Sequence, residues 1–199
     1  MLQTFKIGLC ALAFSMLAGS CFAFDMNRDV DRALENNSTM YSIQMGMPTA
    51  NMISILRENK DGWTSFKSDG KKYQSALADD GKVNTELKIV VKDGKVIAIH
   101  ANYIGQDKKQ MRQIFSTLEN KLIGLYGNNP VEIVPGDKLS HNLTWKLNDL
   151  HRAYNLHSTD VHFDYNGKKV SMYSVSISLT RDDPMDIVYE YEGIGANIG

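Results

Sequence analysis

The fold is decided by residues 83–103, which read VNTELKIVVKDGKVIAIHANY. Apolar and polar residues alternate on both sides of Asp93-Gly94, which is the pattern of two β-strands that each bury one face. Asp-Gly readily adopts the positive φ values that a two-residue type I′ turn requires. We therefore predict an antiparallel hairpin here, with one face in the core of the protein.

A second hairpin is predicted near the C-terminal end of the sequence. Residues 159–165 alternate up to Asn166-Gly167, and residues 170–179 return. Shorter apolar runs at 143–147 and 154–156 precede it, and Asp-Gly turns separate further short runs before the first hairpin. Each half of the chain is therefore expected to hold about four short antiparallel strands.

Three segments have the three- to four-residue apolar spacing of amphipathic helices. The strongest begins after Asp107, a good N-cap, and continues to Leu125 before Gly127 ends it. Shorter helices are expected at residues 24–37 and 49–58. Together with the strands they predict an α+β fold, in which helices cover one face of an antiparallel sheet.

The two halves of the chain resemble each other in the order of their elements. Each hairpin follows a helix and a tryptophan-bearing strand, with Trp63 and Trp145 in comparable places. One interpretation is a repeat of two helix-plus-four-strand units, and the other is that any two amphipathic hairpins look alike. The predicted organisation is a signal peptide at 1–23, units at 24–105 and 106–185, and a tail at 186–199.

Residues 1–23 have the pattern of a secretory signal peptide. A basic residue precedes an apolar run too short to span a bilayer, and Ala23 offers a cleavage position. Both cysteines, Cys10 and Cys21, lie in this segment, and a thiol-free domain of this size is typical of bacterial envelopes. We expect a periplasmic or secreted protein. The alternative is an outer-membrane lipoprotein acylated at Cys21, which lies in a near-match to a lipobox.

Composition excludes some classes of function. The chain has 22 basic and 23 acidic residues and a net charge of −1, without the basic surplus of a nucleic-acid binder. The sequence contains no Gly-x-Ser-x-Gly elbow and no His-Glu-x-x-His zinc signature. We therefore predict no nucleic-acid partner, no cofactor, no transmembrane segment and no catalytic residues.

Histidines and carboxylates gather between His141 and Asp164. In an alternating strand, His162 and Asp164 share one face, opposite Val161 and Phe163. His157, His162 and Asp164 are the candidate ligands for a divalent metal, because imidazole and carboxylate are ligands that zinc uses. A small secreted metal-binding protein or hydrolase is thus one alternative function.

Methionines cluster near the helix predicted at residues 49–58. Met45, Met47 and Met52 are candidate binding residues, because flexible thioether side chains adapt to varied partners. The competing interpretation is that these side chains fill gaps in the core, and it is the one we prefer.

One segment resembles a known family. Residues 41–56, YSIQMGMPTANMISIL, look like the opening segment of the BamE/SmpA outer-membrane lipoproteins, which share a helix-and-sheet unit with the tandem β-lactamase inhibitory proteins. Pro48 interrupts the family's Gly-Met-Thr, and the Gly-x-Pro that follows the family's helix is absent. The resemblance implies an α+β fold and an envelope location, and it allows an inhibitor of a secreted enzyme as an alternative function. It carries over no functional residues.

The leading hypothesis from sequence is therefore an exported, non-enzymatic bacterial domain. It is expected to bind another protein or an envelope component through a face or an edge of its sheet, since these are the surfaces that helices on one side leave accessible.

Overall fold

The computed structural model describes seven stretches of the chain. They are residues 24–35, 38–58, 63–77, 83–128, 131–132, 140–147 and 152–181. The predicted signal peptide, with Cys21 and Ala23, and the predicted tail at 186–199 lie outside them. None of the described helices combines the length and the apolar character needed to cross a membrane.

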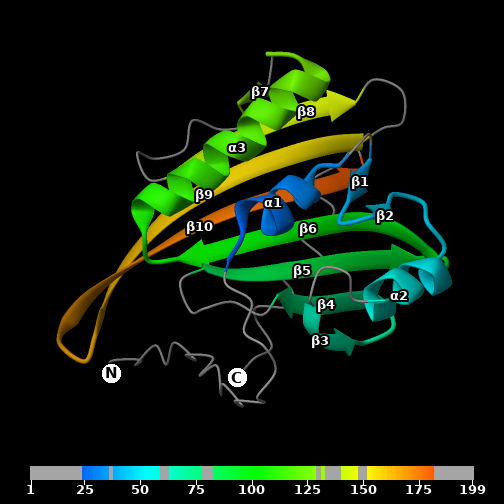
Figure 1. Cartoon of the computed structure of the whole chain (residues 1–199), viewed down its shortest axis with the longest axis horizontal. Helices are drawn as coiled ribbons and strands as arrows, with labels where there is room; N and C mark the ends of the chain where they lie inside the picture. The colour runs from blue at the N-terminus through cyan, green and yellow to red at the C-terminus, as the bar shows by residue number, and fades with distance from the viewer. Residues whose placement is uncertain are drawn as a thin grey trace, which may run out of the picture.

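Eight of the described strands form a sheet in the order β3-β4-β5-β6-β10-β9-β8-β7, with every neighbouring pair antiparallel. The strands are β3 (Trp63–Ser68), β4 (Lys72–Leu77), β5 (Val83–Lys92), β6 (Lys95–Gly105), β7 (Val131–Glu132), β8 (Ser140–Leu147), β9 (Arg152–Tyr165) and β10 (Lys168–Arg181). Two four-stranded meanders thus meet where β6 pairs with β10. Figure 1 shows α1 and α3 on the same face of this sheet, and the predicted α+β class is confirmed.

The first predicted hairpin is confirmed as β5 and β6. Asp93 and Gly94 have φ values of 51° and 71°, the left-handed conformation that the turn requires. Alternate residues of both strands are buried, and they include Val83, Leu87, Ile89, Ile99, Ala101 and Tyr103. The apolar face of the hairpin therefore forms the centre of the core.

The helix α3 (Lys108–Tyr126) covers the second meander. Its first turn is capped by the Asp107 carboxylate, which accepts hydrogen bonds from the backbone N–H groups of Lys109 and Gln110. Gly127, with φ of 87°, ends the helix. Its buried residues are Met111, Ile114, Leu118 and Leu122, and the helix packs on β10, β9, β6 and β8. The helix predicted from Asp107 to Leu125 is confirmed.

The N-terminal segment departs from prediction. Residues 24–37 do not form one helix, because the described part holds a four-residue α1 (Met26–Asp29) and a 3-10 turn at Asp31–Ala33. The small sheet that follows consists of β1 (Thr39–Met40) and β2 (Ile43–Gln44), and it leads into α2 (Thr49–Glu58) as expected.

A buried tyrosine pair explains the interruption. A continuous helix would give the carbonyl oxygen of Asp29 to the N–H of Ala33, but the hydroxyls of Tyr41 and Tyr103 donate to it instead. The N–H of Ala33 turns to the carbonyl of Val30, at 3.1 Å. Burial raises the pKa of both tyrosines, so both hydroxyls keep their protons and can donate. The N-terminal segment is thereby fastened to β6.

Substitutions of two leucines in α3 test how much its buried face contributes to the stability of the protein. Leu118 is fully buried, whereas Leu125 is 45% exposed on the same helix. We expect Leu118→Ala to lower the free energy of unfolding by about 2–5 kcal/mol, because it leaves a cavity under the helix. Leu125→Ala should cost less than about 1 kcal/mol. Urea unfolding followed by circular dichroism measures both, and equal losses would contradict this packing.

Candidate functional site

Strands β9 and β10 extend beyond their neighbours in the sheet. β10 pairs with β6 only from Tyr173 to Thr180, and β9 pairs with β8 only up to Thr159. Beyond those levels, residues 160–165 and 168–172 pair only with each other among the described strands. We call residues 160–172 the distal ribbon. Figure 1 shows it projecting from the sheet at the lower left, and at about 3.4 Å per residue it is roughly 20 Å long.

The apolar side of both strands changes where the ribbon leaves the sheet. Within the sheet, the buried residues that face the helices are Tyr154, Leu156, Val175, Ile177 and Leu179. In the ribbon, the apolar residues are Val161, Phe163, Val170 and Met172. The register of β9 with β10 runs without a shift from Arg152 to Tyr165. Because alternate residues point to opposite faces, the apolar side chains of the ribbon lie on the face away from the helices.

One expectation from sequence is wrong at this point. The pattern predicts separate strands at residues 154–156 and 159–165, but β9 is one strand from Arg152 to Tyr165. The apolar positions change from even to odd numbers between Leu156 and Val161, and this change does not mark a break in the strand. It marks an exchange of the apolar face.

The outer face of the ribbon, the one away from the helices, is an exposed apolar strip. Val161 lies opposite Met172, and Phe163 lies opposite Val170, so the four side chains adjoin across the two strands. Val161 is 47% exposed and Phe163 is 38% exposed. At the tip, Lys168 lies opposite Tyr165 on this same face. Contiguous apolar side chains in such a position are typical of an interaction surface.

The inner face of the ribbon is polar and is attached to α3. The ammonium nitrogen of Lys108 lies 2.5 Å from a carboxylate oxygen of Asp160 and 5.2 Å from the ring centre of Tyr173. Nδ1 of His162 lies 2.8 Å from the hydroxyl of Ser171, and the imidazole meets the Tyr173 ring edge-on. These contacts orient the base of the ribbon relative to the helix.

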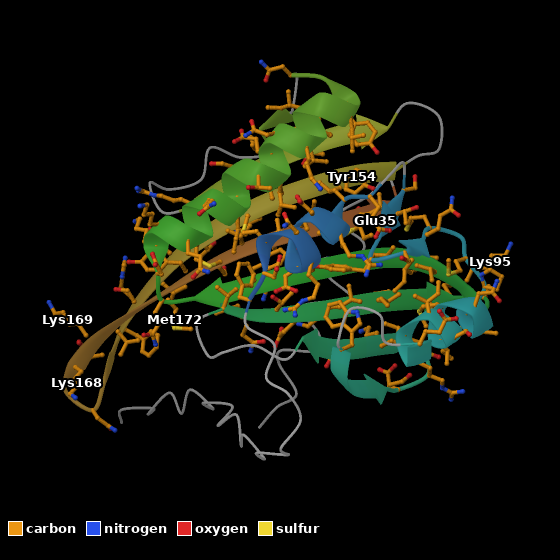
Figure 2. The ribbon with its side chains drawn as sticks, viewed as in Figure 1. Glu35, Lys95, Tyr154, Lys168, Lys169 and Met172 are labelled. Atoms are coloured by element: carbon orange, nitrogen blue, oxygen red, sulfur yellow. The ribbon has the colours of Figure 1, made fainter. Side chains whose placement is uncertain are left out.

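The tip separates two neighbouring lysines. Lys168 belongs to the outer face, and Lys169 belongs to the inner face, where it lies opposite Asp164. Figure 2 shows Lys169 and Met172 pointing to opposite sides of the ribbon. The charges of the inner face are therefore balanced by Asp164 and Asp160, whereas the outer face has a lysine and no carboxylate within the described ribbon.

The candidate metal ligands are not brought together. His162 and Asp164 share the inner face, but His157 lies on the opposite face of β9, with Nε2 2.7 Å from the hydroxyl of Thr159. Within the described ranges, no group of three or more His, Cys, Asp or Glu side chains is placed to hold a metal ion. The side chain of His141 and the whole of His151 lie outside those ranges.

The candidate binding methionines belong to the core region. Met52 is fully buried, and Met45 and Met47 are partly buried against the core. This placement matches the role of gap-filler better than that of an exposed contact patch.

Within the sheet, two adjacent rows on the face away from the helices are polar. One row across the strands holds Lys88, His100 and Ser178, and the next row holds Glu86, Asn102 and Ser176. Burial, with a smaller contribution from the ammonium of Lys88, lowers the pKa of His100 from 6.5 to about 4. His100 is therefore neutral at physiological pH.

Comparisons of the chain with protein-family models, with curated proteins and with solved structures find no match. Function is therefore inferred from the geometry of the described residues. The resemblance of residues 41–56 to the BamE/SmpA lipoproteins stays a prediction.

His100 makes the stability of the protein depend on pH. Because the folded state holds this proton less readily than the unfolded state, its contribution to stability is full above pH 6.5 and is lost as the pH falls towards 4. We expect His100→Gln to reduce the fall in the free energy of unfolding between pH 6.5 and 4 by roughly 1–3 kcal/mol. Urea unfolding across this range measures the effect. Asn102→Ala changes a neighbouring residue without a titratable group, so it should leave the loss of stability between pH 6.5 and 4 unchanged. If the same loss persists in His100→Gln, another group causes it.

The contact between Lys108 and Asp160 should govern local order more than global stability. The ion pair lies at the surface, so Asp160→Asn should lower the free energy of unfolding by less than about 1 kcal/mol. Amide exchange should accelerate in residues 160–172, because the ribbon loses its attachment to α3. Hydrogen-exchange mass spectrometry measures this, with Asp164→Asn as the matched control. Equal acceleration in the two variants would contradict the anchoring role.

Proposed function

We propose that this protein is an exported bacterial binding domain, not an enzyme, and that it docks onto a protein surface through the outer face of the distal ribbon. The observation that carries the proposal is the exchange of the apolar face. It occurs at the same level of β9 and β10, between the pair Val161–Met172 and the pair Ser158–Val175. In both strands the apolar positions move to the other face at the same level, so the ribbon keeps one common apolar face. A ribbon that is simply exposed to solvent does not require such a face.

A protein is a better partner for this surface than a lipid bilayer. The tip of the ribbon consists of Asn166, Gly167, Lys168 and Lys169, all exposed, so the end that would enter first is polar. Beyond Tyr173 and Thr159 the ribbon has two open backbone edges among the described strands. Unpaired backbone groups are costly in hydrocarbon, whereas a protein surface can pair with them.

Export is supported by the pattern of residues 1–23, and an enzymatic role finds little support. His157 and His162 lie on opposite faces of one strand, so they do not converge on a common site. A lipid anchor at Cys21 remains the alternative to cleavage after Ala23, and either is compatible with a ribbon that binds proteins in the envelope.

Photo-cross-linking in living cells tests the proposal. A photoreactive phenylalanine analogue is placed at Phe163 on the outer face and, as a matched control, at Asp164 on the inner face. We expect a protein adduct from position 163 and none from position 164. Mass spectrometry identifies the adduct and the mature N-terminus, which should begin at Phe24 in the cleaved form or at acylated Cys21 in the anchored form.

Binding of the identified protein is then measured with purified components. Val161→Asp combined with Phe163→Asp should weaken binding by at least about tenfold, because charged groups replace the apolar strip. Leu125→Asp, at an exposed leucine on α3, should bind as the wild type does. Adducts from both positions, adducts with lipid, or no adduct from position 163 would overturn the proposal. Recovery of the chain from the cytoplasm with residues 1–23 intact would overturn export.

A further inference from the structure

We infer that residues 182–192, which follow β10 in the sequence, fold back onto the face of the sheet away from the helices and cover it beside Thr180. The inference goes beyond the proposed function, because it concerns the end of the sheet opposite the distal ribbon. A group of buried residues lies there, on a face that none of the described helices covers.

These buried residues form one patch across the strands. Val90, Ala98 and Thr180 are aligned in one row of β5, β6 and β10, and all three are buried. Thr144 on β8 is also buried, in the neighbouring row, which contains His100. Both rows lie on the face away from the helices, because residues two positions apart on a strand share a face. We call these five residues the covered patch.

The sheet itself cannot bury this patch. Thr180 is paired with Ala98 on β6 and with Ala153 on β9, yet it is only 2% exposed. Side chains stand roughly upright on a sheet, and alanine is too short to shield a threonine beside it. Among the described helices, α1 and α3 lie on the other face (Figure 1), and α2 packs Met52 and Leu56 into the core. The patch therefore needs a cover from outside the described ranges.

The hydroxyl of Thr180 indicates the chemistry of the cover. It is buried, and it has no hydrogen-bond partner among the described residues. A buried hydroxyl without a partner is costly, so a cover that brings a hydrogen-bonding group is favoured. A polypeptide segment brings a backbone carbonyl with every residue.

Several of the segments outside the described ranges begin far from the patch. Residues 78–82 and 133–139 lead to Val83 and Ser140, which pair with their neighbours at the base of the distal ribbon. Residues 148–151 lie at the correct end of the sheet, but they form only the short connection between β8 and β9.

The C-terminal segment begins beside the patch. β10 ends at Arg181, the residue after Thr180, and Pro184 has no N–H to donate to a continued sheet ladder. Val90 lies two strands from Thr180, which is about 10 Å. Residues 182–192 span up to about 36 Å when they are extended, so they can reach across the whole patch.

The pattern of this segment suits a buried face. Residues 182–192 read DDPMDIVYEYE. Met185, Ile187, Tyr189 and Tyr191 occupy every second position, which is typical of an extended segment with one apolar side. Such a side can pack on the valine and the alanine of the covered patch, while the other side faces water.

Charge favours the same segment. Residues 182–192 hold five carboxylates and no basic residue. Lys72 and Lys88 lie at the margin of the covered patch, and the two rows of the patch contain no carboxylate among the described strands. Glu86, 3.9 Å from the ammonium of Lys88, belongs to the next row towards the ribbon. An acidic segment is therefore attracted to this end of the face.

His100 reports whether the patch is covered. Burial, with a smaller contribution from the ammonium of Lys88, lowers the pKa of this imidazole from 6.5 to about 4. Water that reached the face would stabilise the charged imidazole. Loss of the cover should therefore raise the pKa of His100, whereas changes elsewhere in the protein should not.

Photo-cross-linking of the purified protein identifies the cover. A photoreactive phenylalanine analogue replaces Lys88 at the margin of the patch or, as a matched control, Arg112, which is exposed on α3. We expect position 88 to form an adduct with residues 182–192 of its own chain, and position 112 to form none with them. Mass spectrometry of the product with the mass of one chain locates the adduct.

The pKa of His100 gives a second readout in the full chain. Ile187→Ser combined with Tyr189→Ser removes apolar side chains from the segment without changing its charge. We expect this variant to raise the pKa of His100 from about 4 towards 6.5 in an NMR titration, in which the signal missing from His100→Gln is the assigned one. Ile194→Ser combined with Ile198→Ser, beyond the segment, should leave the pKa unchanged. Circular dichroism checks that both variants fold.

Each outcome decides the inference. An adduct of position 88 with residues 182–192, together with the rise in the pKa of His100, supports it. An adduct with another part of the chain, a product with the mass of two chains, or no adduct overturns it. An unchanged pKa in the variant at 187 and 189, or an equal rise in the control, also overturns it. None of these results depends on what the distal ribbon binds, so the proposed function is decided by its own test.

Discussion

The uninterrupted register of β10 with both of its neighbours is the constraint on which the rest of the structure depends. β10 pairs with β9 along its whole length and with β6 from Tyr173 to Thr180. Because no residue is inserted between β10 and these two neighbours, the parity of each position fixes its face along β9, β10 and the paired part of β6. The burial of Ile177 under α3 and the exposure of Phe163 on the ribbon are therefore two results of the same ladder.

Those parts of the fold that depend on local chemistry could be predicted from the sequence. Asp93-Gly94 and Asn166-Gly167 specify their turns by conformational preference alone, and Asp107 specifies the start of α3. The interruption after α1 could not be predicted in this way. It depends on Tyr103, which is distant in sequence and donates a hydrogen bond to the carbonyl of Asp29. Only the folded protein brings these two residues together.

The candidate site could be predicted only in part from the sequence. Alternation places His162 and Asp164 on one face and Val161 and Phe163 on the other. The exchange of faces is also visible, because the step of five positions from Leu156 to Val161 is odd. What the sequence does not reveal is whether a bulge absorbs that odd step, since a bulge leaves no reliable signal in residue types. The observed register contains no bulge, and this turns a change of pattern into a surface feature.

The junction between β6 and β10 also has a consequence for the order of events during folding. It joins positions as far apart in sequence as Ala98 and Thr180, whereas the hairpins on either side close through turns of two residues. Loop-closure entropy favours the local hairpins first, so the two meanders form before they join. Until they do, each presents its last strand as an open edge of similar length. In a crowded compartment, the β6 edge of one chain can then pair with the β10 edge of another. Slow pairing of β6 with β10 within one chain is therefore the folding step at which domain swapping is most favoured.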